Sequence, residues 1–148
     1  MSRLILALVF AASCVLAQMP PSSTSAEKSG TPDLRPGIYE LAGVLGNEGF
    51  KVRDGAWAGS LQGAKPQRLS VNLFAGNQYW FCAATSAPGE TPNLTLRDPS
   101  GQATEMARFD KDGVAAAGVT AAVTGRYTLE IKGSSSGTRE FCLLYLYK

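Results

Sequence analysis

The sequence predicts an all-β domain, a sandwich or barrel of about eight or nine short strands. The first observation is an alternation of apolar and polar residues: within 67–74, Leu69, Val71 and Leu73 alternate with polar residues. Such a period of two gives a half-buried strand one apolar and one solvent-facing side. The second observation is that turn sequences such as Asp98-Pro99-Ser100-Gly101 interrupt this pattern at short intervals, with no helical pattern between them.

The predicted strands differ in the strength of their alternation. The clearest are 67–74, 78–85, 93–98, 126–132 and 140–147. Weaker strands are predicted at 38–45, 50–52, 57–62 and 103–109. The segment 114–123 is ambiguous, because its alanines suit a helix whereas Gly113, Gly118 and Gly125 argue against one of any length.

Residues 1–17 are predicted to be a cleaved secretory signal peptide. Arg3 supplies a positive charge, the run 4–16 is apolar, and Val15-Leu16-Ala17 fits a cleavage site before Gln18. The run is shorter than the roughly 20 residues of a membrane-spanning helix, so we expect no membrane insertion. We therefore expect the mature protein to be secreted, or to lie in the periplasm or cell envelope.

Cys14 offers an alternative, because a lipoprotein signal places a cysteine at the cleavage point. Ala11 stands where such signals usually have leucine, and the apolar run continues beyond Cys14. Cleavage after Ala17 is therefore preferred to lipidation.

The mature chain is expected to contain a linker followed by one domain. Residues 18–36 are small, polar and rich in Pro, Ser and Thr, which favours a flexible tether with little to bury. The β-sandwich domain is expected to span 37–148.

Two cysteines, Cys82 and Cys142, remain after signal cleavage. An even pair in an oxidising compartment predicts a disulfide, which requires the last strand to lie beside the strand at 78–85. Two buried free thiols are the alternative interpretation. Their separation excludes a CxxC motif, and zinc would lack ligands because the chain has no histidine.

The charge pattern disfavours nucleic acid and anionic membranes as partners. The formal net charge of +2 falls to +1 when Arg3 is lost with the signal. The remaining basic residues are dispersed among acidic ones and form no block of the kind those partners require.

Five segments resemble the bacterial pre-peptidase C-terminal domain, a jelly-roll-like β-sandwich appended to many exported enzymes. They are 59–61, 67–73, 75–81, 94–101 and 124–131, and the similarity extends over roughly 59–147. The resemblance implies a jelly-roll-like antiparallel β-sandwich. The shared residues mark turns and core positions rather than chemistry, and the catalytic domain that usually accompanies such modules is absent from this sequence.

No catalytic constellation can be assembled, so we do not expect an enzyme. Without histidine there is no Ser-His or Cys-His pair, and the sequence has no G-x-S-x-G elbow. Glu105 with Asp110 or Asp112 is the nearest pair of carboxylates, and solvated loop acids are the simpler interpretation.

Asp110-Lys111-Asp112-Gly113 is similar to the start of a calcium loop, which makes Asp110 and Asp112 weak metal candidates. No further oxygen ligands or closing glutamate follow at the required spacing, and the same residues form ordinary turns. We therefore expect neither metal nor cofactor.

Aromatic residues are the remaining candidates for ligand contact. Trp57 and Tyr79 could stack on a sugar ring, with Tyr145 and Tyr147 as further candidates. Adjacent Tyr79 and Trp80 point to opposite sides of a strand, and Trp80 shares its side with Cys82. Trp80 is therefore expected in the core.

These observations predict a secreted, non-catalytic binding or adhesion module that recognises a glycan or a protein. The alternative is a structural or accessory protein that acts with an exported enzyme in trans.

Overall fold

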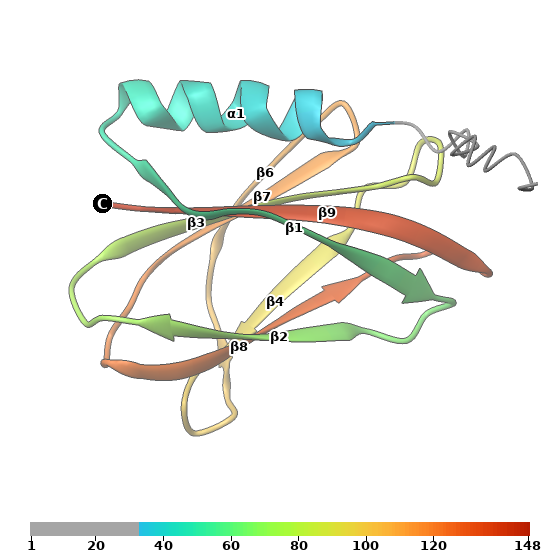
Figure 1. Cartoon of the computed structure of the whole chain (residues 1–148). Helices are drawn as coiled ribbons and strands as arrows, with labels where there is room; N and C mark the ends of the chain where they lie inside the picture. Colours follow the sequence, from blue (N-terminus) through green and yellow to red (C-terminus); the bar gives the residue numbers. More distant parts are fainter. Residues whose placement is uncertain (1–32) are drawn as a thin grey trace, which may run out of the picture.

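The computed structural model describes residues 33–148 of the chain, which contain nine β-strands and one helix (Figure 1). The predicted signal peptide, Cys14 and most of the linker lie outside the described residues. In chain order the elements are α1 (Arg35–Asn47), β1 (Lys51–Gln62), β2 (Gln67–Leu73), β3 (Gln78–Thr85), β4 (Asn93–Arg97), β5 (Ala103–Thr104), β6 (Ala107–Lys111), β7 (Val114–Thr120), β8 (Gly125–Lys132) and β9 (Thr138–Tyr147).

The strands form two antiparallel sheets packed face to face, which confirms the predicted β-sandwich. The five-stranded sheet has the order β1-β9-β3-β7-β6, and the four-stranded sheet has the order β2-β8-β4-β5. Without β6, these orders are those of an eight-stranded jelly roll, in which β1-β9-β3-β7 packs on β2-β8-β4-β5. The ambiguous segment at 114–123 contains strand β7.

The main core lies between the two sheets. The alternation recognised in the sequence directs Val71 and Leu73 of β2 and Tyr127 and Leu129 of β8 into this layer, where all are buried. The Tyr127 hydroxyl donates to the carbonyl oxygen of Val123 at 2.9 Å, so its polar end is satisfied inside the core.

The segment predicted as a strand at 38–45 is instead part of helix α1, which corrects that prediction. Ile38, Ala42 and Leu45 are buried on one side of the helix. Their spacing follows the helical period rather than the period of two. Pro36 is accommodated in the first turn. Gly49, with φ of +92°, follows the end of the helix.

Helix α1 forms a third layer on the outer side of the five-stranded sheet (Figure 1). The side chains beneath it include Cys82 of β3 and Leu144 and Leu146 of β9, all fully buried. A strand of the sandwich normally has its outer side in water, whereas here that side is apolar and needs a cover. The helix is that cover.

Cys82 and Cys142 lie on neighbouring strands, as the predicted bridge required, but both are free thiols in the structure. The register is the reason: Cys82 is opposite Leu144, and Cys142 is opposite Ala84. The cysteines are thus diagonal neighbours, a relation that usually separates Cα atoms by about 7–8 Å. A disulfide requires about 4.4–6.8 Å.

Candidate binding groove

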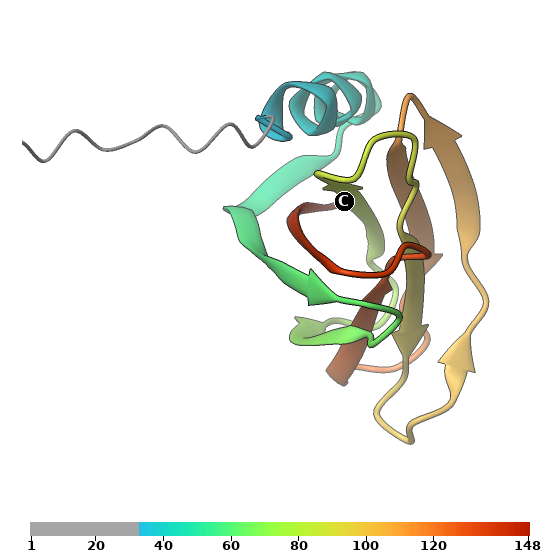
Figure 2. The ribbon, with the colours of Figure 1, turned by 90° about the vertical axis from the view of Figure 1, so that its right-hand side faces the viewer.

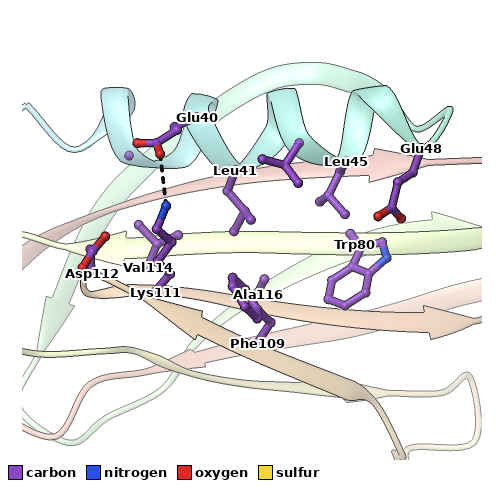
Figure 3. Close-up of a pocket in the computed structure, with 12 residues that line it drawn as sticks. Glu40, Leu41, Leu45, Glu48, Trp80, Phe109, Lys111, Asp112, Val114 and Ala116 are labelled. Atoms are coloured by element: carbon purple, nitrogen blue, oxygen red, sulfur yellow. Dashed lines mark hydrogen bonds and ion pairs between the residues drawn. The ribbon is translucent and has the colours of Figure 1, made fainter.

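An apolar groove lies between helix α1 and the outer side of β6 and β7, with a volume of about 370 Å³ (Figure 3). Helix α1 packs mainly over β3 and β9, also covers Val114 and Ala116 of β7, and leaves the edge strand β6 exposed. The groove is the space along that exposed edge. Its volume falls within the range of pockets that hold small ligands or the side chains of a partner.

The floor of the groove combines small residues with two aromatic rings. Ala116 of β7 leaves space above the sheet, while Trp80 of β3 and Phe109 of β6 lie beside it (Figure 3). The indole of Trp80 rests against Gly118, where an added Cβ atom would lie 2.6 Å from the ring. Glycine at this position therefore allows the indole to lie close to the sheet.

The wall of the groove is one side of helix α1. Leu41 and Leu45 point from the helix toward the floor (Figure 3), and Val44 of the same helix also lines the groove. Val44 and Phe109 remain 55% and 48% exposed, so apolar surface is left in water on both sides of the groove. Apolar side chains that face each other across a hollow are typical of an interaction site.

Charged groups are confined to the ends of the groove. At one end, Lys111 Nζ lies 3.1 Å from Glu40 Oε1, joining β6 to the helix, with Asp112 close by (Figure 3). The hydrogen bond and charge of Glu40 raise the pKa of Lys111. Glu48 lies at the other end, beyond Trp80 (Figure 3). The three acids outnumber the single lysine, so the rim carries net negative charge.

Of two adjacent aromatic residues on β3, the predicted ligand contact is the more deeply buried one. Tyr79, a predicted ligand contact, is fully buried between the sheets, and its hydroxyl accepts a 2.9 Å hydrogen bond from the Phe74 backbone N–H. Trp80, expected in the core, is partly buried: it packs against the cluster around Cys82 beneath α1 and also lines the groove. The alternation predicted that the two rings lie on opposite sides of β3, but not which side faces the second sheet.

The other predicted aromatic contacts belong to the core. Trp57 is partly buried and packs edge-on against Tyr145, with ring centroids 5.9 Å apart. Tyr145 is itself buried, and Tyr147 packs against the same cluster. None of these three residues lines the groove.

The predicted carboxylates are not gathered into a site. Asp112 and Gly113 form the two-residue turn between β6 and β7, with φ of +50° and +80°. Asp110 is exposed on β6, and Glu105 is exposed between β5 and β6. Within residues 33–148, no group of three or more Cys, Asp or Glu side chains is placed to hold a metal ion.

The groove residues share one missed sequence signal. Glu40, Leu41 and Val44 lie at helical spacing on one side of α1, and Glu48 at its C-terminal cap continues that spacing. A strand prediction for the same segment hides this period. A helix predicted from the sequence at 35–47 would have indicated an apolar helix surface above the sheet.

Comparison with known proteins adds no identification. No known family matches the chain, and no curated protein matches it. Among residues 33–148, no helix is long and apolar enough to cross a membrane.

Proposed function

We propose that the protein is a secreted, non-catalytic binding module that holds apolar side chains of a partner protein in the groove beside α1. The observation that carries the proposal is the exposed apolar lining contributed from two sides, by Val44 of the helix and Phe109 of β6. Burying such surface supplies the main favourable free energy of protein association.

A protein partner fits this groove better than a glycan does. Sugar hydroxyl groups need hydrogen-bonding partners along the whole ligand, whereas the polar side chains here lie only at the ends. The acidic ends also favour a partner segment whose apolar residues are flanked by Lys or Arg. The resemblance to a module carried by exported enzymes supports an exported enzyme as the source of that segment.

A displayed library of short peptides selected on the immobilised domain tests this function. We expect enrichment of sequences with spaced apolar residues and basic flanks, because these complement the lining and the rim. Binding of a selected peptide is then measured for the unchanged protein, for Val44→Glu and for Val123→Glu.

The two variants are matched, because Val44 and Val123 are 55% and 51% exposed. Val123 does not line the groove. Val44→Glu should abolish binding, and Val123→Glu should retain it. Equal binding by both variants, or a failure to select any peptide, would contradict the proposal. Glycan-array binding that Val44→Glu removes would instead assign the groove to a sugar.

A further inference from the structure

Strand β6 forms a free edge of the five-stranded sheet. Its backbone pairs with β7 on one side, and all five of its residues are exposed. Among the described residues, none hydrogen-bonds to its other side. Figure 2 shows β6 at the outer edge of the molecule, on the side opposite β1. An unpaired strand of this kind is a template for another strand.

The turn that follows β6 determines which backbone groups are free. Asp112 and Gly113 form a two-residue turn with positive φ at both positions, so Lys111 and Val114 are a hydrogen-bonded pair. Bonded positions alternate along an antiparallel ladder. The N–H and C=O groups of Arg108 and Asp110 therefore point away from β7, toward the open edge.

We propose that a second copy of this chain pairs with β6 in antiparallel orientation, with Phe109 on the two-fold axis. In this register, Arg108 of one copy lies opposite Asp110 of the other, and the reverse pair is formed on the other side of the axis. The two residues with free backbone groups thus meet each other and exchange both N–H···O bonds. Their side chains have opposite charges, which favours direct cross-strand neighbours.

The other edges do not offer this self-complementarity. In β1 the register is broken between Arg53 and Trp57, with positive φ at Asp54 and Gly55, and such a bulge disrupts an edge. In β2 the only charged residue is Arg68, so a second copy would supply no opposite charge. In β5 there are only two residues.

The dimer would join the two grooves on one face of the molecule. A two-fold axis perpendicular to the sheet keeps both copies of α1 on the same side. The two Phe109 rings would meet on that side, on the floor between the helices. This pairing stands independently of the groove's ligand, because it uses the backbone and the charges of β6.

Cross-linking at the axis gives a direct test. Residues opposite each other in a non-hydrogen-bonded antiparallel pair have Cα atoms about 4.5 Å apart, within the range of a disulfide. Phe109→Cys should therefore form a covalent dimer under mild oxidation. Phe74→Cys is the matched control, because Phe74 is a phenylalanine of similar exposure, 50%, directly after β2 of the other sheet.

Charge reversal tests the register. Asp110→Arg should weaken dimerisation roughly ten-fold by placing like charges opposite each other. The double variant R108D/D110R should restore it, because the swapped pair is again complementary. Arg108 also donates a 2.9 Å hydrogen bond to the carbonyl oxygen of Leu94, so Arg108→Asp alone measures the effect of losing that bond. Glu140→Arg, an equal change of charge at an exposed position of β9, should have no effect.

Sedimentation over a range of concentrations measures these differences. A five-residue edge is much smaller than a standard interface of roughly 1,600 Å², so we expect a weak dimer, populated at high concentration. Circular dichroism verifies that each variant is folded. Cross-linking of Phe109→Cys no greater than that of Phe74→Cys, or failure of the double variant to recover the affinity lost in Asp110→Arg, would overturn the proposal.

Discussion

The guanidinium of Arg139 lies 2.7 Å from the carboxylate of Glu90, and both side chains are almost fully buried. Arg139 Nε makes this ion pair without a well-aligned hydrogen bond, while its Nη atoms donate to the carbonyl oxygens of Gly137 and Gly63. Glu90 also accepts hydrogen bonds from Thr85 Oγ1 and from the backbone N–H groups of Ser134 and Ser135. The pair and its hydrogen bonds therefore link three loops, those between β1 and β2, between β3 and β4, and between β8 and β9.

Replacing Glu90 with glutamine should destabilise the protein by about 3–5 kcal/mol, because it leaves the buried charge of Arg139 uncompensated. Urea denaturation measures the change in the free energy of unfolding. Glu140→Gln is the control: Glu140 is exposed and should change stability by less than about 0.5 kcal/mol. A loss below about 1 kcal/mol for Glu90→Gln would show that the ion pair is dispensable.

Stability should fall in acid, in part through Glu90. Burial acts to raise the pKa of Glu90, but the Ser135 and Ser134 amides, the Thr85 hydroxyl and the charge of Arg139 together lower it below its ordinary value of 4.5. The unfolded chain then takes up the proton more readily than the folded protein. The stabilisation that the ionised Glu90 contributes is therefore complete above pH 4.5. It is lost as the pH falls through the lowered pKa of Glu90 in the folded protein.

The stability difference between the unchanged protein and Glu90→Gln should thus be largest near neutral pH and shrink in acid. Urea denaturation at several pH values measures it. A difference that stays constant down to pH 3, well below the ordinary pKa of 4.5 for this carboxyl group, would contradict this assignment.

Gly118→Ala should disturb the groove without altering its exposed wall. The added Cβ atom would meet the indole of Trp80 at 2.6 Å, so the ring must move away from the sheet. We expect a destabilisation of about 1–3 kcal/mol, and a shift in tryptophan emission recorded with Trp57 replaced by phenylalanine. An unchanged emission spectrum would show that the indole does not rest on Gly118.

The two cysteines should be unreactive in the folded protein. Burial raises the pKa of Cys82 to about 12 and also raises the pKa of Cys142, so neither thiolate forms near neutral pH. A thiol reagent such as Ellman's should detect neither in the native state and both after denaturation. If denatured protein shows no free thiol until a reductant is added, the cysteines are bridged, as the sequence alone suggested.

Gly43→Ala should stabilise the protein by about 0.5–1 kcal/mol, because alanine loses less backbone entropy in a helix. An added Cβ atom at Gly43 meets no other atom within 4 Å. Gly49→Ala should have the opposite effect, because Gly49 has a φ of +92°. Thermal denaturation compares the two variants, and destabilisation by Gly43→Ala would contradict the helix.

The positions of most strands could be predicted from the sequence, because alternation is a local property of the chain. Strands β2, β3 and β8 begin and end within a residue or two of the predicted ranges. The alternation also separated Tyr79 from Trp80. The side of a strand that carries each residue follows from backbone geometry alone.

The tertiary structure decided which element packs against each side of a strand. Both sides of β3 are apolar, so the local pattern could not distinguish the side facing the second sheet, with Tyr79, from the side facing the helix, with Trp80. Likewise, the sequence predicts that Cys82 and Cys142 lie on neighbouring strands. The pairing register of β3 and β9 decides that the two cysteines are offset by two residues and are not directly opposite each other. The groove depends on how far α1 extends across the sheet, and that position results from packing between segments distant in the chain. Local sequence determines secondary structure and side-chain alternation, whereas register and coverage are long-range contacts that exist only once the sheets have assembled.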